Sequence, residues 1–84
     1  MAERTVIVAS AQGLHARPAK IFTQAAAGKG ATIAKEGGTP IDAASILRVM
    51  ALGVKNGESV TVTAEDEAVV AELAQLLETD LDAE

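Results

Sequence analysis

Ser59-Val60-Thr61-Val62-Thr63-Ala64 is the stretch of sequence that decides the fold. Apolar and hydroxyl side chains alternate strictly along it, and successive side chains of a β-strand point to opposite faces of the sheet. The pattern therefore predicts a strand with its two valines and its alanine on a buried face and its hydroxyl groups on the other face. A sheet built around such a strand needs helices on one face only.

The first third of the chain predicts a strand followed by a helix. Residues 5–9 are β-branched and apolar, which indicates a strand with Val6 and Val8 on one face. Residues 16–27 are mostly helix formers, and Gly28 and Gly30 can end the helix. Its apolar side chains at helical spacing are Ile21, Phe22, Ala25 and Ala26.

The next segment predicts a β-hairpin. Residues 31–36 have a weak strand pattern, Gly37-Gly38 is typical of a two-residue turn, and residues 39–42 follow as the second strand. Because Pro40 has no N–H to donate, we expect this second strand at an edge of the sheet.

Two further helices are expected on either side of the alternating strand. Ser45 is a suitable N-cap for a short helix over residues 46–52, and Asn56-Gly57 indicates a turn after it. Asp66 is a candidate cap for a last helix over residues 67–81. The apolar stripe of that helix consists of Val69, Val70, Leu73, Leu76, Leu77 and Leu81.

The order of elements is βαββαβα, with no repeat and no linker. We predict one α+β domain over residues 1–84, with three amphipathic helices on one face of a four-stranded, mostly antiparallel sheet.

Composition excludes several classes of function. The 84 residues contain Phe22 as the only aromatic and have a formal net charge of −5, which makes nucleic acid an improbable partner. Without cysteine and with a single histidine, neither a thiolate nucleophile nor a structural zinc site is expected. The first residues lack the apolar stretch of a signal peptide or membrane span, so we expect a cytoplasmic protein without membrane insertion.

The stretch Gly13-Leu14-His15-Ala16-Arg17-Pro18-Ala19 carries the chemistry. His15 falls at the cap of the predicted helix, and Pro18 fits its first turn, where N–H groups lack helical partners. The helix dipole disfavours protonation of the imidazole and favours an anion beside it. Ala16 and Arg17, in the first turn, are candidate phosphate-binding residues, the latter through charge-assisted hydrogen bonds. His15 and Arg17 therefore form a candidate phosphoryl-accepting pair, although a lone histidine near an arginine is more often a surface cap.

This stretch resembles the active-site motif of the HPr family, the histidine-containing phosphocarriers of the bacterial sugar phosphotransferase system. A second block, from Ser45 to Gly53, is similar to the regulatory segment of that family and lies at the expected distance. The resemblance covers the whole chain. It implies an open-faced β-sandwich and a stoichiometric carrier, not an enzyme, that receives a phosphoryl group from enzyme I on the Nδ1 atom of His15. Enzyme IIA proteins or domains would then take it, with assistance from Arg17. It also implies that the chain needs no metal or organic cofactor.

The second block suggests regulation and docking. In many relatives the serine that matches Ser45 is phosphorylated by a dedicated kinase, although Arg48 here replaces a frequent glycine; an ordinary N-cap is the alternative role of Ser45. The helix of residues 46–52 has more apolar side chains than one inward stripe requires, so we expect part of them in water. Candidate partner-binding residues are Ile46, Leu47 and Met50.

Other functions compete with that of a phosphocarrier. A hydrolase with His15 as general base lacks a cysteine, a GxSxG motif or paired carboxylates as partners. A regulatory binding module of the same fold is a stronger rival, but the joint presence of His15, Arg17 and Pro18 argues against it. A nitrogen-related paralogue of the carrier remains open, and we expect a monomer.

Overall fold

The computed structural model describes residues 2–9, 13–14 and 16–79. Its elements follow the predicted order βαββαβα, and residues 80–84, including Leu81, lie outside the described residues. The elements are β1 (Ala2–Ile7), α1 (Ala16–Ala26), β2 (Thr32–Lys35), β3 (Ile41–Asp42), α2 (Ile46–Ala51), β4 (Ser59–Ala64) and α3 (Glu67–Glu78).

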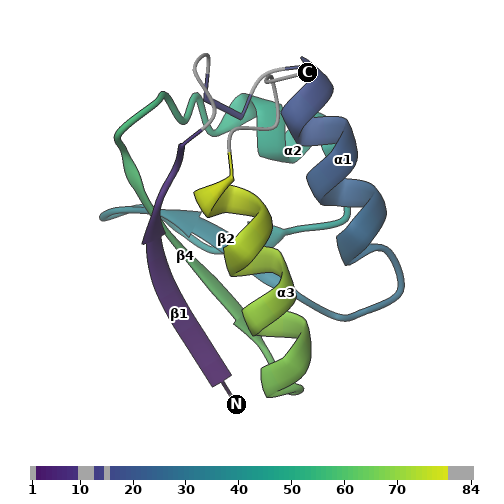
Figure 1. Ribbon diagram of the computed structural model, residues 1–84. Coiled ribbons are helices and arrows are strands. Elements are labelled where there is room, and N and C mark those ends of the chain that lie inside the picture. The colour runs from purple at the N-terminus through teal and green to yellow at the C-terminus, as the bar shows by residue number, and fades with distance from the viewer. Residues whose placement is uncertain (1, 10–12, 15, 80–84) are drawn as a thin grey trace.

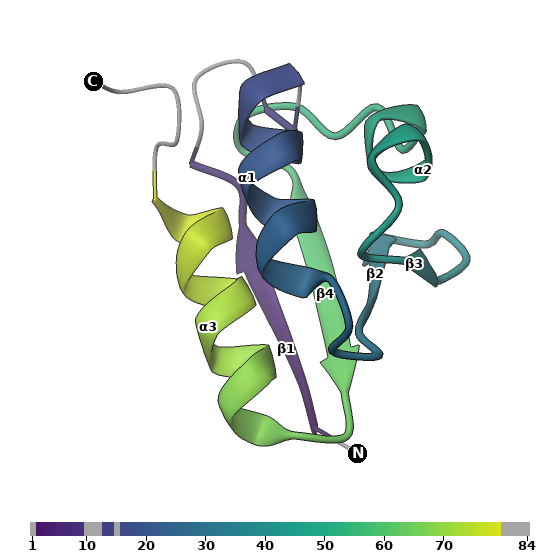
Figure 2. The same cartoon turned by 90° about the vertical axis from the view of Figure 1, so that its right-hand side faces the viewer.

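The four strands form one sheet in the order β1-β4-β2-β3, and every neighbouring pair is antiparallel. β4 lies inside the sheet and pairs with β1 from Ala2↔Ala64 to Ile7↔Ser59. The helices all cover the same face (Figures 1 and 2). α3 packs against β1 and β4, while α2 packs against α1 and β3. The predicted α+β architecture is therefore confirmed, with a fully antiparallel sheet.

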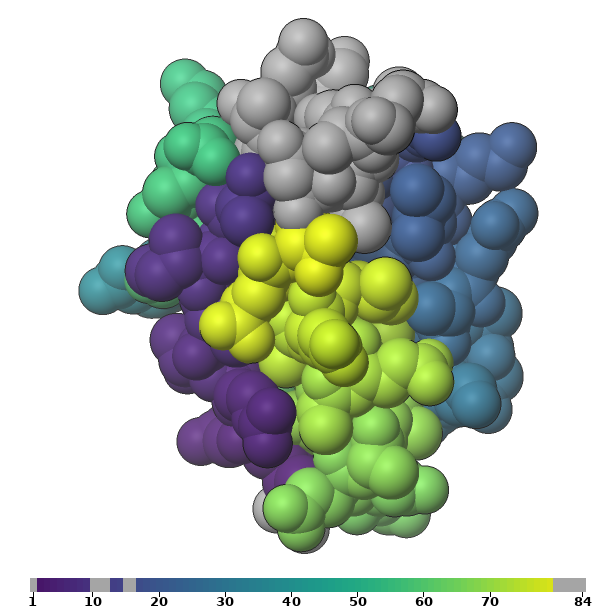
Figure 3. Space-filling view, in the orientation of Figure 1, coloured from purple at the N-terminus to yellow at the C-terminus, as the bar shows by residue number. Residues whose placement is uncertain are grey.

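The core lies between the sheet and the helices. As the alternation in β4 predicts, Val60, Val62 and Ala64 are buried and the hydroxyl residues between them are only half-buried. Phe22 of α1 is fully buried against this layer. In the space-filling view, α3 fills the surface between the β1 edge and α1 (Figure 3). Other large, fully buried side chains are Ile33, Val49, Val70, Leu73 and Leu77.

The first strand begins and ends earlier than predicted. It runs over Ala2–Ile7, and not over residues 5–9, because pairing with β4 draws in the charged residues Glu3 and Arg4. Val6 and Val8 are nevertheless both buried, as predicted, since the Val8 N–H still donates to the Glu58 carbonyl at 3.0 Å beyond the strand end.

The predicted two-residue turn at Gly37-Gly38 is wrong. β2 ends at Lys35 and β3 is only Ile41–Asp42, so residues 36–40 form a longer connection. Pro40 would stand opposite Ala34 in the observed register, and it has no N–H for the ladder. The expected place of this strand at an edge of the sheet is confirmed.

The helix ends are close to those predicted. α1 stops at Ala26, one residue early, and α2 ends at Ala51 with Leu52 as its C-cap. α3 ends at Glu78, short of residue 81. Both predicted N-caps are confirmed: the Ser45 side chain accepts from the Arg48 N–H at 3.4 Å, and that of Asp66 from the Ala68 N–H at 2.9 Å. None of the described helices is long and apolar enough to cross a membrane.

We expect Phe22→Ala to lower the free energy of unfolding by about 3 to 5 kcal/mol, because it removes the only aromatic ring from a buried site. Gln24→Ala, at an exposed position of the same helix, should change it by less than about 0.5 kcal/mol. Urea unfolding followed by circular dichroism measures both. Similar midpoints for the two variants would show that the ring does not hold α1 on the sheet.

Candidate functional site

The residues singled out for phosphoryl chemistry surround the start of α1. The helix begins at Ala16, and Arg17 and Pro18 belong to its first turn. Gly13 and Leu14 lead into this turn and are both buried. His15, between Leu14 and Ala16 in the chain, lies outside the described residues. The neighbours of His15 on both sides are therefore fixed by the fold.

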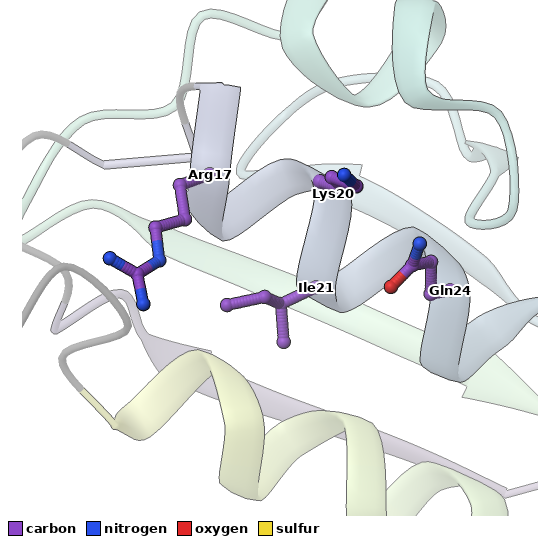
Figure 4. A pocket seen from close by; sticks show the side chains of 4 residues that line it. All are labelled: Arg17, Lys20, Ile21 and Gln24. Atoms are coloured by element: carbon purple, nitrogen blue, oxygen red, sulfur yellow. The ribbon is translucent and has the colours of Figure 1, made fainter.

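Arg17 is exposed on the first turn of α1. It lines a shallow groove along the helix with Lys20, Ile21 and Gln24, and Ile21 points toward α3 (Figure 4). No acidic residue occupies the first turn of α1. No carboxylate of that turn therefore offsets the positive end of the helix dipole.

Gly13 lies directly against the connection between α2 and β4. Its φ of +72° is in the left-handed region, and an added Cβ would overlap the Val54 carbonyl oxygen and lie 2.6 Å from the Cα of Lys55. The next residue, Leu14, donates its N–H to the same Val54 carbonyl at 3.1 Å. Only glycine permits this approach, which fixes the path of the chain immediately before His15.

The α2–β4 connection is itself held by Glu58. One carboxylate oxygen accepts the Lys55 N–H at 2.8 Å, and the other lies 3.3 Å from the Lys35 ammonium. The Lys55 N–H lowers the pKa of this carboxyl, and the charges of Lys35 and Lys55 add to that effect while desolvation opposes it. Glu58 is therefore ionised at neutral pH and supports the backbone on which Gly13 rests.

The short helix α2 presents apolar side chains to solvent beside α1, against which it packs. Leu47 is 78% exposed, and Ile46 and Met50 are 37% and 36% exposed. We call these three residues the α2 patch. The expectation that part of this helix faces water is confirmed, while Val49 supplies its buried side. The helix α2 itself lies at the end of the molecule where α1 begins (Figure 2).

The contacts around Asn56 were missed by sequence reasoning. The Asn56-Gly57 pair was interpreted only as a turn, and Gly57 does adopt a φ of +87°. The Asn56 side chain, however, donates to the Ala9 carbonyl at 3.1 Å, across 47 residues of sequence. No local pattern marks such a contact. Among the described residues, no group of three or more histidines, aspartates and glutamates could hold a metal ion.

Comparison with known proteins identifies the family. Residues 2–79 match the family model described as the PTS HPr component phosphorylation site. The chain belongs to the HPr family. A phosphocarrier protein HPr from Streptomyces coelicolor is 49% identical over 78 residues, which cover 90% of this chain and 84% of that protein.

Solved structures of HPr proteins share the fold. The crystal structure of HPr-C-His from Thermoanaerobacter tengcongensis matches with a TM-score of 0.88 and 34% identity, covering 100% of this chain and 99% of that one. For a phosphocarrier protein HPr from Bacillus anthracis the TM-score is 0.83 and the identity 32%, with 90% of this chain and 95% of the other covered.

Family membership defines the class of function. The chain is an HPr phosphocarrier of the phosphotransferase system, a non-catalytic protein that carries a phosphoryl group on a histidine and transfers it. This excludes the hydrolase considered from the sequence. It also agrees with the open groove that Arg17 lines beside the start of α1.

We expect Gly13→Ala to destabilise the fold more than Gly28→Ala. The two glycines have nearly equal φ values, +72° and +74°, but a Cβ at Gly28 meets nothing within 4 Å. Gly28→Ala therefore measures the backbone strain alone, about 1 to 2 kcal/mol, and Gly13→Ala adds the overlap with Val54. Thermal unfolding of both variants decides the matter. Equal losses of stability would show that the contact with Val54 yields without cost.

Proposed function

We propose that this HPr-family chain accepts a phosphoryl group from enzyme I on His15 and donates it to enzyme IIA proteins or domains. The observation that carries the assignment to this residue is that His15 is the single histidine of the chain and directly precedes the first residue of α1. A family that carries phosphoryl groups on histidine leaves no other acceptor in this sequence.

The start of α1 supports both the nucleophile and its phosphorylated form. The positive end of the helix dipole favours a neutral imidazole, which can attack phosphorus, and then favours the phosphoryl anion. Ala16 can offer a first-turn N–H, and Arg17 can offer charge-assisted hydrogen bonds to the phosphoryl oxygens. Arg17 thus stabilises the group in transit without bonding to it covalently.

The size of these effects suits a carrier. A helix dipole contributes about 0.3 to 2 kcal/mol, and a hydrogen bond to a charged group about 1.5 to 3 kcal/mol. Their sum orients a phosphohistidine without trapping it. A deep, many-sided anion site would hold the group too firmly for the next protein to remove.

The α2 patch is the surface that we assign to docking of enzyme I and of the enzyme IIA acceptors. Ile46, Leu47 and Met50 form an exposed apolar area on a helix that packs beside α1. Such an area suits transient contacts, since each partner must be released after transfer. The family implies these two kinds of partner.

Ser45 is our candidate for regulatory phosphorylation by a serine kinase. Its hydroxyl caps α2, and a phosphate there would be favoured by the helix dipole, so the fold would be retained. The added charge would stand directly before Ile46 and Leu47, where a partner with an apolar surface would have to desolvate it. We further propose that the protein acts in the cytoplasm as a monomer.

Incubation with phosphoenolpyruvate and enzyme I should add one phosphoryl group per chain, measured by intact mass. The group should be acid-labile, as a phosphoramidate is, and His15→Ala should abolish labelling because no other histidine is present. Circular dichroism of that variant controls for loss of fold. Normal labelling of a folded His15→Ala chain would overturn the assignment.

We expect Ser45→Asp and Leu47→Glu to slow phosphorylation of His15 at limiting enzyme I roughly tenfold to hundredfold, matching a desolvation penalty of about 1 to 3 kcal/mol. Ser45→Ala should transfer at the rate of the parent. Ile7→Glu is the matched charge control, because Ile7 is 54% exposed and alternates with the buried Val6 toward the uncovered face of the sheet. Unchanged rates for both Ser45→Asp and Leu47→Glu would remove α2 from the docking surface.

A further inference from the structure

The connection between α2 and β4 holds both ends of the segment that joins β1 to α1. On the β1 side, the Asn56 side-chain amide donates to the Ala9 carbonyl at 3.1 Å and to the Val8 carbonyl at 3.5 Å. The Gly57 N–H also donates to the Val8 carbonyl, at 2.9 Å. On the α1 side, the Val54 carbonyl accepts the Leu14 N–H. One short connection therefore anchors the chain before and after residues 10–12.

Further backbone hydrogen bonds fix Val8 and Ala9. The Val8 N–H donates to the Glu58 carbonyl at 3.0 Å, and the Ala9 N–H donates to the Leu77 carbonyl at the end of α3 at 2.9 Å. The N–H and the carbonyl groups of both Val8 and Ala9 are thus hydrogen-bonded. Since the chain from Ala9 to Leu14 is short, fixing its two ends restricts where the next residue, His15, can be presented.

Asn56 is the side chain on which this arrangement depends. The other anchors are backbone groups, which a substitution of the side chain leaves in place. Asn56 is exposed and contributes nothing to the hydrophobic core, so its contacts with Val8 and Ala9 cannot be explained as packing. The hydrogen bond from the Lys55 N–H to the Glu58 carboxylate stabilises the turn in which Asn56 lies.

We propose that Asn56 is a positioning residue for phosphoryl transfer, which acts through the Val8 and Ala9 carbonyls on the segment that presents His15. This inference rests on the proposed function of His15. It predicts an effect on the transfer step and not on docking, because Asn56 lies outside the α2 patch. Misplacement of a reacting group by about 1 Å can slow a reaction roughly hundredfold, so a partial loss of anchoring should be readily measured.

The test is single-turnover transfer from phosphorylated enzyme I to the full chain, over a range of chain concentrations. We expect Asn56→Ala to lower the maximal rate constant roughly tenfold and to leave the half-saturating concentration within about twofold of the parent. Asn56→Gln keeps an amide donor and should recover part of the loss. A docking defect would instead raise the half-saturating concentration.

Asp66→Ala is the matched control. Like Asn56→Ala, it removes side chain to backbone hydrogen bonding by an exposed residue, here the 2.9 Å bond from the Ala68 N–H, at the start of α3 and at the opposite end of the molecule (Figure 1). It should lower the melting temperature about as much as Asn56→Ala does, yet transfer like the parent. Equal slowing by both variants would mean that stability, not positioning, causes the effect, and would overturn the proposal.

A second readout does not depend on transfer. With one histidine in the chain, the imidazole signals in a proton NMR spectrum belong to His15, and their pH titration should shift in Asn56→Ala but not in Asp66→Ala. If the parent accepts no phosphoryl group, the proposed function of His15 fails, and the positioning role falls with it. If the parent transfers and Asn56→Ala equals it in rate and titration, only the positioning role is overturned.

Discussion

The antiparallel pairing of β1 with β4 is the constraint on which the rest of the molecule depends. It joins residues that are more than fifty positions apart, from Ala2↔Ala64 to Ile7↔Ser59, and continues as the bond from Val8 to Glu58. The segment that follows β1 and the connection that precedes β4 must therefore leave the sheet at the same end. The start of α1 and the helix α2 lie at that end (Figures 1 and 2), so one pairing brings together the segments on which the proposed function rests.

The helices cover only one face of the sheet, and this explains how so small a domain forms a hydrophobic core. The buried face of β4 meets Phe22 and the apolar stripes of the helices, whereas the other face is lined by hydroxyl groups, including the 2.8 Å pair of Thr5 and Thr61. All apolar burial is concentrated in one layer, as a chain of this length requires. The start of α1, with the exposed Arg17, lies at the end of that layer.

Sequence reasoning was accurate where structure follows from local pattern. The alternation in β4, the N-caps Ser45 and Asp66 and the edge position forced by Pro40 were all predicted, because each depends on neighbouring residues or on a missing donor. It was wrong where pairing overrides propensity: Glu3 and Arg4 do not resemble strand residues, yet β4 recruits them. The start of α1 was located correctly from the motif around Pro18. The contacts of Asn56 had no local sign, since its acceptors Val8 and Ala9 lie 48 and 47 residues away in the sequence.

The acceptor residue of a phosphocarrier has to meet two requirements at the same time. It must be exposed enough for two different proteins to reach, which removes the option of holding it in a pocket, and it must also be presented in one geometry to both. Because an exposed acceptor cannot be oriented by packing, its orientation has to come from the backbone beside it. Here the segments on both sides of residues 10–12 are hydrogen-bonded to the α2–β4 connection, through Val54 at one end and Asn56 and Gly57 at the other. Gly13 allows the two segments to approach closely enough for those bonds to form. These contacts fix the chain on both sides of residues 10–12 by hydrogen bonds and not by burial in a pocket.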